Sequence, residues 1–379
     1  MTQTNYQICT NCIMDTTDSK ISFDSNGQCD HCHNYYETIK PNWHPNEKGE
    51  KLLAPLIEKI KKDGKGRDHD CIIGISGGVD SSYVAYLAKE KFGLRPLLFH
   101  VDAGWNTQIA ANNIQKLVDG LGLELYTEVV DWQEMKDLQK AFFKSQVSYI
   151  DYPQDLSYFS ALYRFSMKNK FKYVLTGANY STECVREPVE WGAYYIDKRF
   201  IKDIHGQFGT IPLKTFPLTN IFTYKIGYQV FGGQTLVKPL NYTRYIKDEV
   251  IEELTERFGW QKYAHKHHES RFTRFFECYW LPKKFGFDKR RAHFSSLILT
   301  EQMTREEALA RISKPEIDEE TMAQDFEYVA KKLDLTESDL NKLMEGENKT
   351  YKDYKNSMFL INLGKYVLEL IGAQKVKIR

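Results

Sequence analysis

The sequence has no long apolar run and almost no net charge. No stretch reaches eighteen consecutive apolar residues, and the first residues lack the basic and then apolar pattern of a secretion signal. We therefore expect a cytoplasmic protein without a membrane partner. Lys and Arg number 52 and Asp and Glu 51, so the formal net charge is +1. Such a balance creates no overall field that attracts nucleic acid, which makes a nucleic-acid partner a disfavoured hypothesis.

Cysteine is scarce, but four of the seven residues form one pattern. Cys9 and Cys12 make one CxxC pair, and Cys29 and Cys32 make a second pair after sixteen residues. This spacing is typical of a four-thiolate zinc site, and a reducing cytoplasm disfavours disulfides. Four thiolates complete a tetrahedron, so we expect structural Zn²⁺ in a small ribbon and linker over residues 1–48. An iron–sulfur cluster is the alternative ligand for the same cysteines.

The common nucleotide-binding motifs are absent too. No Walker loop and no dinucleotide GxGxxG is present, but a glycine turn, Ser-Gly-Gly-Val-Asp-Ser-Ser, lies between an apolar run at 71–75 and a helical pattern at 83–92. The glycines accept positive φ, and the helix N-terminus favours an anion. This pattern predicts a phosphate-binding loop in which Asp80 holds the Mg²⁺ of a polyphosphate. The expected loop contacts are Ser76, Gly77, Gly78, Val79, Asp80, Ser81 and Ser82, of which Asp80 and Ser81 are also expected to act in catalysis.

This turn resembles the Ser-Gly-Gly-x-Asp-Ser pyrophosphate loop of the N-type ATP pyrophosphatases, the PP-loop superfamily. The resemblance implies ATP as a cosubstrate. It also implies that the loop holds the β- and γ-phosphates while the α-phosphate is transferred as AMP.

Strand and helix patterns alternate over residues 49–241. Apolar runs at 71–75, 96–102, 123–130 and 173–177 are separated by helical patterns. The alternation predicts an α/β fold with a doubly wound parallel sheet, whose ligand lies at the carboxyl ends of the strands. Asp102 and Asn106 follow the second strand and are expected to contact the nucleotide, with Trp105 stacking on it.

The segment 176–183 follows the fourth strand. Its Thr-Gly-x-Asn pattern resembles that of several PP-loop enzymes, which implies nucleotide contacts for Gly177 and Asn179. Glu183 is expected to hold Mg²⁺ or to orient an amine donor. A plain helix N-cap is the alternative interpretation.

Residues 242–379 are mainly helical in pattern and are expected to bind the acceptor or a partner. Two stretches at 268–276 and 288–296 mix basic, aromatic and hydroxyl side chains, a composition suited to a sugar nucleotide. The expected substrate contacts are Arg271, Arg274, Lys289, Arg290, Arg291 and His293. A nucleic-acid patch or an ion-pair network is the alternative. The His265-x-His267-His268 run invites a metal interpretation, but no cysteine or carboxylate spacing supports it.

The double CxxC pattern, the loop at 76–82, the segment 176–183 and the two basic stretches together resemble the N-acetyl sugar amidotransferases of bacterial surface-glycan biosynthesis, which include O-antigen and LPS formation. The resemblance implies conversion of an acetamido group to an acetamidino group on an N-acetylated sugar. It also implies a separate glutaminase, similar to that of histidine biosynthesis, as the ammonia source.

The chemistry agrees with the residues present. The acetamido oxygen attacks the α-phosphate of ATP, pyrophosphate leaves, and ammonia then displaces AMP. No protein nucleophile is needed, and the sequence has no Ser-His or Cys-His arrangement. Two alternatives stay open: a tRNA-thiolating enzyme with Cys184 as sulfur carrier, and a non-catalytic nucleotide-binding subunit of an amidotransferase complex.

Overall fold

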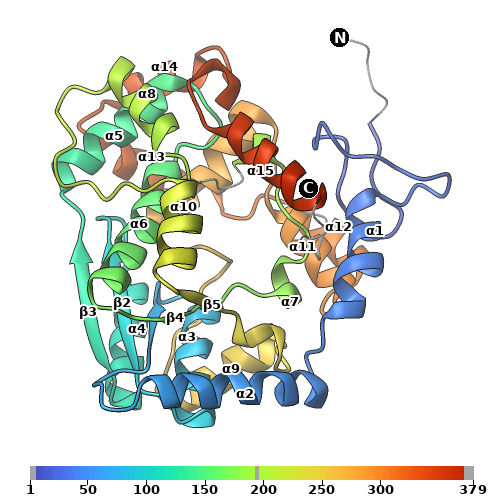
Figure 1. Ribbon diagram of the computed structural model, residues 1–379. Helices are drawn as coiled ribbons and strands as arrows, with labels where there is room; N and C mark the ends of the chain where they lie inside the picture. The colour runs from blue at the N-terminus through green and yellow to red at the C-terminus, as the bar shows by residue number, and fades with distance from the viewer. Residues whose placement is uncertain (1–5, 193–195, 371–379) are drawn as a thin grey trace.

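The computed structural model describes residues 6–192 and 196–370 (Figure 1). A five-stranded sheet has the order β3-β2-β1-β4-β5, and every neighbouring pair is parallel. The strands are β1 Cys71–Gly74, β2 Pro96–Asp102, β3 Glu124–Val129, β4 Tyr173–Leu175 and β5 Thr235–Val237. The predicted doubly wound α/β fold is confirmed. The sequence did not predict β5, because a strand of three residues is too short to show a periodic pattern.

The two faces of the sheet pack against different helices. In β1 the side chain of Ile73 joins one hydrophobic core and that of Ile72 joins another, since successive strand residues point to opposite faces. The first core contains residues of α2 (Glu47–Asp63), α3 (Val79–Tyr86), α4 (Gln108–Leu121) and α9 (Lys247–Phe258), and α2 and α9 lie at the bottom of Figure 1. The other face is covered by α6 (Tyr152–Lys168).

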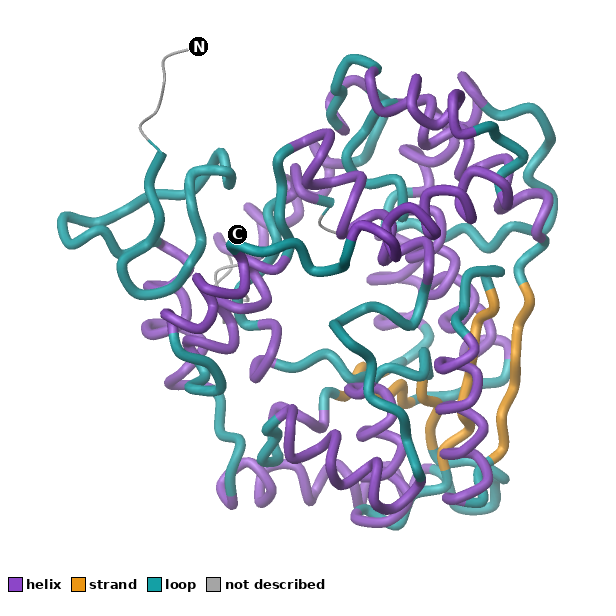
Figure 2. Tube along the Cα trace, turned by 180° about the vertical axis from the view of Figure 1, so that it is seen from behind, coloured by secondary structure: helices purple, strands orange, loops and turns teal. Residues whose placement is uncertain are grey.

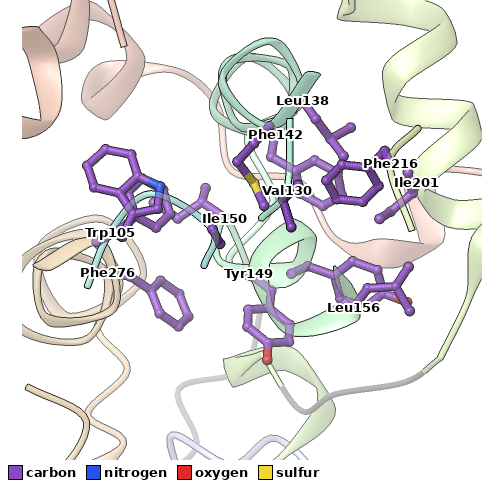
Figure 3. Packing of buried hydrophobic residues seen from close by; sticks show 14 of the residues in the cluster. Trp105, Val130, Leu138, Phe142, Tyr149, Ile150, Leu156, Ile201, Phe216 and Phe276 are labelled. Carbon is purple, nitrogen blue, oxygen red and sulfur yellow. The ribbon is translucent and has the colours of Figure 1, made fainter. Parts of the chain in front are cut away.

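The second core is rich in aromatic side chains and extends into the C-terminal helices (Figure 3). It contains residues of α5 (Trp132–Ser145), α8 (Lys198–Phe208), α10 (Arg271–Phe275), a π-helix η7 (Phe276–Phe285), α13 (Glu319–Lys332) and α14 (Glu337–Glu345). Trp105 is 1% exposed here, and its indole N–H donates to Gln139 Oε1 at 2.9 Å. The expectation that Trp105 stacks on a nucleotide is therefore wrong, because its ring is a core residue.

Shorter elements connect these layers. They are α1 Asp30–Asn34, η1 Tyr35–Ile39, η2 Lys40–Asn42, η3 Leu87–Lys91, α7 Tyr180–Glu183, η4 Val189–Trp191, η5 Thr223–Phe231, η6 Pro239–Asn241, α11 Arg290–Leu299, α12 Arg305–Ile312, η8 Tyr351–Asp353 and α15 Met358–Leu370. The sequence predicted a polar linker over 35–49, whereas η1 and η2 continue the helical path and bury Tyr35 and Ile39. Among the described residues, no helix is both long and apolar enough to cross a membrane.

The N-terminal ribbon docks on helices from the far end of the chain. Figures 1 and 2 both show it beside the helical segments of the C-terminal region. Arg305 donates to the carbonyl oxygens of Cys12 at 3.0 Å and Cys9 at 2.8 Å, and Arg291 pairs with Asp15 at 2.9 Å. These contacts fix the ribbon on α11 and α12.

The packing of α9 bears on the division of the chain. This helix contacts α3 and α4, so it belongs to the same layer as the loop-bearing helix α3. A boundary near residue 268 follows the packing better than the expected one at residue 241.

Candidate active site

The loops after β1 and β4 meet at the switch point of the sheet. These two strands are neighbours, and ligands of open parallel sheets bind in the crevice at such a point. A Cβ built on Gly177 would lie 2.8 Å from the carbonyl carbon of Asp80, so a glycine is needed where the two loops touch. Gly77 has φ +85° and packs against the backbone of Ala110, which also requires a glycine.

A cleft of about 610 Å³ opens at this edge of the sheet. One wall, here called the sheet wall, comprises Ser76, Gly78, Val79, Asp80, Ser81, Asn106 and Gly177. The facing wall, here called the charged wall, comprises Glu183, Lys266, His267, Glu269, Glu277, Lys289 and His293. The cleft thus brings five residues of the predicted loop, all but Gly77 and Ser82, together with Glu183, Lys289 and His293.

The sheet wall fits a polyphosphate. Helix α3 starts at Val79 with Gly78 as N-cap, and no side chain caps it. The N–H groups of a first helical turn have no partner within the helix, so they are available to phosphate oxygens. Ser81 Oγ donates to the Gly78 carbonyl at 3.2 Å, and the Gly78 N–H donates to Ser76 Oγ at 3.2 Å. These bonds hold the turn in shape.

Ser82 does not take part in this loop with its side chain. Its hydroxyl is 0% exposed and accepts a hydrogen bond from Trp260 Nε1 at 3.2 Å. The side chain faces the core between α3 and α9, so a phosphate contact through this hydroxyl is excluded by its position. One residue of the loop predicted from the sequence is therefore a packing residue.

Asp80 lies at the base of the cleft. Its carboxylate accepts hydrogen bonds from Tyr245 Oη and from Asn179 Nδ2, the latter at 3.2 Å. Burial, and then the nearby charge of Glu183, raise the pKa of Asp80. A carboxylate whose ionised form is disfavoured in this way gains from a divalent cation, so the residue fits a Mg²⁺ that accompanies ATP.

Glu183 forms an ion pair within the charged wall. Its Oε1 lies 2.8 Å from Lys266 Nζ. Burial opposes ionisation of Glu183, but the charge of Lys266 outweighs it and holds the pKa of the carboxyl below its ordinary value. Lys266 was not predicted as a site residue, because it lies 83 positions away in sequence and no motif marks it.

Glu269 is a further site residue that the sequence did not single out. A Cβ built on Gly78 would lie 2.7 Å from Glu269 Oε1, so this carboxylate reaches the phosphate loop itself. The Thr107 N–H donates to the Glu269 carbonyl at 2.9 Å, which ties this segment to the loop after β2. Burial raises the pKa of Glu269. Its membership of a basic and aromatic stretch was the one signal available in the sequence.

A second cavity of about 490 Å³ adjoins the cleft. It lies beside the N-terminal ribbon and shares with the cleft the side chains Glu183, Lys266, His267, Glu277, Lys289 and His293. Lys289 bridges Glu277 at 2.8 Å and Glu187 at 3.1 Å. Burial and the charge of Lys266 lower the pKa of His293 well below its usual value, so its ring is neutral. Lys289 and His293 were predicted from the sequence and line both cavities.

The other predicted substrate contacts have partners within the protein. Arg271 and Arg274 pair with Asp325, which is 0% exposed, at 2.8 and 2.5 Å. Neither arginine lines the cleft or the second cavity. Arg290 pairs with Asp288 at 2.6 Å at the edge of the second cavity, and Arg291 is part of the ribbon docking. The alternative of an ion-pair network thus describes the surroundings of Arg271 and Arg274.

Asp102 and Asn106 lie after β2 as expected. Asn106 lines the cleft, and its Nδ2 lies 2.8 Å from His100 Nε2. Asp102 accepts from the Gly104 N–H at 2.8 Å and opens instead to a neighbouring cavity of about 420 Å³. Of the two, Asn106 is the residue that lines the cleft.

The four ribbon cysteines form a site that fits zinc. All four are buried, and the Sγ separations of Cys9–Cys32, Cys12–Cys29 and Cys29–Cys32 are 3.7, 3.6 and 3.7 Å. Tetrahedral Zn–S bonds of 2.3 Å give an edge of about 3.8 Å. Backbone N–H groups of Asn11 and Cys12 point at Cys9 Sγ, as expected for a thiolate. An iron–sulfur cube would hold its cysteines farther apart, so the geometry favours a single ion.

Comparison with known proteins gives two family matches. Residues 50–186 match the family described as NAD synthase, and residues 269–368 match the family described as LPS biosynthesis protein WbpG-like, C-terminal domain. A glutamine-hydrolyzing GMP synthase of Aeropyrum pernix is 32% identical over 82 residues, which is 22% of this chain and 15% of that protein. An uncharacterized protein of Methanocaldococcus jannaschii is 41% identical over 70 residues, 18% of this chain and 24% of that protein. The matches thus span less than a quarter of either relative.

Solved structures with some likeness include an NH3-dependent NAD synthetase from Campylobacter jejuni, with 16% identity and a TM-score of 0.31 over 79% of this chain and 98% of that one. The U34-tRNA thiolase NcsA from Methanococcus maripaludis has 14% identity and a TM-score of 0.33 over 75% and 80%. The assignment of the fold rests on the strand order and the family match, not on these scores.

The strand order, the loop after β1 and the match over residues 50–186 define a PP-loop domain of the NAD synthase type. The chain joins this domain to a WbpG-like C-terminal domain, which supplies part of the charged wall. This combination is consistent with an N-acetyl sugar amidotransferase of the PP-loop superfamily, the family that the sequence resembles.

Proposed function

We propose that this protein is an ATP-dependent, AMP- and pyrophosphate-forming amidotransferase that converts an acetamido group of an N-acetylated sugar to an acetamidino group in surface-glycan biosynthesis. One observation carries the proposal: the phosphate loop after β1 faces charged side chains of the WbpG-like domain, such as Glu269 and Glu277, across one cleft. ATP and the acceptor would therefore meet between the two domains.

The sheet wall would bind ATP. Its helix N-terminus and the hydroxyls of Ser76 and Ser81 suit the β- and γ-phosphates, and Asn106 and Asn179 suit polar contacts nearby. Asp80 and Glu269 are the carboxylates best placed for Mg²⁺, since Asp80 belongs to the loop and Glu269 Oε1 lies 2.7 Å from a Cβ built on Gly78. A bound Mg²⁺ would neutralise charge that develops on the leaving pyrophosphate.

The second cavity would hold the acceptor. Arg186 and Lys238 line it, and neither forms an ion pair with any residue that the structure describes. Burial, and next the charge of Arg186, lower the pKa of Lys238, so an anion between the two would be stabilised. We assign the diphosphate of a nucleotide sugar to this pair instead of to Arg271 and Arg274. The acetamido group would then reach the cleft past Lys289 and His293.

His293 is the side chain best suited to be the general base. Its ring is held neutral, it lines both cavities, and its buried Nε2 has no hydrogen-bond partner within the described part of the chain. A neutral imidazole accepts a proton from the attacking nitrogen, while Glu183 with Lys266 would orient the ammonia. The ammonia is proposed to come from a separate glutaminase partner.

The thiolation alternative lacks an accessible cysteine in the described residues near the loop. Cys184 is 4% exposed, donates to the Ser296 carbonyl at 3.8 Å, and its pKa is raised by burial to about 12. A sulfur carrier needs a reactive thiolate, so this environment favours a packing role for Cys184.

The test is an ammonium-fed reaction with Mg-ATP and a set of N-acetylated nucleotide sugars, followed by mass spectrometry and nucleotide chromatography. The proposal expects a product with one oxygen replaced by NH, together with equal amounts of AMP and pyrophosphate. Formation of AMP and pyrophosphate only with tRNA would instead support thiolation. ATP binding without turnover, in the presence of both ammonium and acceptor, would support the non-catalytic subunit.

A further inference from the structure

Three side chains with metal-binding atoms converge beside the charged wall. The ligand atoms of His268, Cys278 and Glu316 all lie within 4.8 Å of one another. Cys278 Sγ is 3.9 Å from His268 Nε2 and 3.9 Å from Glu316 Oε2. His265 lies next to this cluster, with its Nδ1 3.0 Å from the other carboxylate oxygen of Glu316, Oε1. The cluster is separate from the ribbon cysteines.

The separations suit a single tetrahedral ion. With Zn–S bonds of 2.3 Å and Zn–N or Zn–O bonds near 2.0–2.1 Å, tetrahedral geometry gives edges of about 3.5 Å. The two edges from the sulfur atom are slightly longer than this. Rotations of side chains alone can close such differences. A mixed set of imidazole, thiolate and carboxylate ligands is of the type that Zn²⁺ accepts.

Hydrogen bonding alone explains the cluster poorly. The contacts of Cys278 Sγ with His268 Nε2 and Glu316 Oε2, both at 3.9 Å, are weak hydrogen bonds, because a thiol is a weak donor and acceptor. His268 is 6% exposed, so bulk water adds little to these contacts. A metal ion would hold the three side chains more strongly.

The cluster also joins three segments that frame the cleft. His265 and His268 come from the connection between α9 and α10, Cys278 comes from η7, and Glu316 comes from the connection between α12 and α13. The first connection carries Lys266, His267 and Glu269 into the cleft, and both His265 and Glu316 line it. His267 has φ +62°, a conformation that is unfavourable for a non-glycine residue and persists only where the surroundings enforce it.

We propose that His268, Cys278 and Glu316 bind a second Zn²⁺, which holds the 265–269 segment in place at the cleft. Three protein ligands leave one tetrahedral position for water, and the ion would tie three separate segments together. The sequence did not reveal the site because Cys278 lies 10 positions from His268 and 38 from Glu316, a spacing that matches no metal motif.

The first test counts metal in the full-length protein by inductively coupled plasma mass spectrometry after dialysis against metal-free buffer. We expect about two equivalents of Zn²⁺ in the wild type and about one in Cys278→Ala and in His268→Gln. The control Cys184→Ala removes a buried thiol outside the cluster and should keep both equivalents. One equivalent in the wild type, or an unchanged content in Cys278→Ala, would overturn the proposal.

A second test needs no variant and so avoids a failure of the variants to fold. Alkylation of Cys278 in the native wild-type protein is followed by peptide mass spectrometry, with added Zn²⁺ and after treatment with a chelator. We expect at least a tenfold faster reaction after chelation, while Cys71 and Cys184 keep the same rate in both conditions. Equal rates at Cys278 would contradict a zinc–thiolate bond. Neither test requires turnover, so the outcome does not depend on the proposed amidotransferase activity.

Discussion

The two walls of the cleft are built from different material. The sheet wall relies on backbone groups and small residues, with Gly177 at a position that excludes a Cβ and Asp80 as its one carboxylate. The charged wall relies on long side chains joined in ion pairs, such as Lys266 with Glu183 and Lys289 with Glu277. A backbone cradle suits the polyphosphate that is common to many proteins, whereas side chains set what else is bound. The difference teaches that nucleotide use and acceptor choice are encoded separately in this chain.

The largest expected effect tests the sheet wall. Asp80→Asn should lower pyrophosphate formation about 1000-fold, about 4 kcal/mol in activation free energy, because the loop loses its ligand for Mg²⁺. The rate of pyrophosphate release at saturating Mg-ATP measures the change. The control Ser82→Ala removes a neighbouring hydroxyl that faces Trp260, and it should retain a rate within threefold of the wild type. Full activity of Asp80→Asn would remove the sheet wall from the mechanism.

The second effect tests the charged wall through stability. Lys289→Met should lower the free energy of unfolding at pH 7 by about 3 kcal/mol, because it leaves Glu277 buried with one partner fewer. Burial opposes ionisation of Glu277, but Lys289 and His267 outweigh it and hold the pKa of this carboxyl below its ordinary value. A depressed folded-state pKa contributes stability above pH 4–5 that is lost as the pH falls further, so the variant should also unfold at a higher pH in acid.

Urea unfolding of both proteins between pH 7 and pH 3 measures these two quantities. The control is Lys283→Met, at an exposed position of η7, the π-helix that carries Glu277. This variant should change the free energy of unfolding by less than about 0.5 kcal/mol. An unchanged acid midpoint in Lys289→Met would show that the ion pair does not set the protonation state of this wall.

The third effect probes the contact between the two loops of the sheet wall. Gly177→Ala should cost about 2 kcal/mol and weaken ATP binding, because the new methyl group meets the backbone of Asp80 and Ser81. Thermal unfolding without Mg-ATP measures the loss of stability, and the shift on adding Mg-ATP measures the weaker binding. The control Gly206→Ala adds a methyl group in the interior of α8 where no atom lies within 4 Å, and it should stabilise the protein by about 0.5–1 kcal/mol. A neutral Gly177→Ala would contradict the close contact of the loops.

The smallest effect separates structural arginines from those assigned to the acceptor. Arg271→Gln should lower stability by about 1 kcal/mol, since Arg274 still compensates Asp325, and should leave the KM for the acceptor within twofold. Arg186→Gln should instead raise that KM about tenfold, equivalent to about 1.4 kcal/mol, with little change in stability. Steady-state kinetics and thermal unfolding of the two variants distinguish a structural arginine from one that binds the acceptor. The reverse pattern would restore Arg271 to the acceptor site.

The sequence was informative wherever chemistry depends on neighbours in the chain. The ribbon cysteines and the loop at 76–82 are local patterns, and the apolar runs at 71–75, 96–102, 123–130 and 173–177 coincide with β1 to β4 within two residues at each end. Even there Ser82 was assigned to the wrong side, because a motif does not show which way each side chain of a helix points. The three residues of β5 were missed for lack of length.

Contacts between distant segments could not be predicted in this way. Lys266 pairs with Glu183 from 83 positions away in the sequence. Glu269, the first residue of the WbpG-like match, lies next to Gly78 of the phosphate loop. Arg271 and Arg274 have the composition of phosphate ligands, but the structure neutralises them with Asp325. A basic and aromatic stretch therefore indicates that a site is near, but only the folded structure shows which of its residues face the ligand.

The docking of the ribbon has a consequence for the order of events on the ribosome. All four thiolates have been synthesised by residue 32, so the ribbon can bind its metal early and locally. Its support, Arg305, follows Cys12 by 293 residues, a delay of roughly 15–60 s at ordinary elongation rates. During that time the surface that later meets α11 and α12 stands open on the nascent chain. Release of a truncated product that lacks α11 and α12 would leave this surface of the ribbon uncovered.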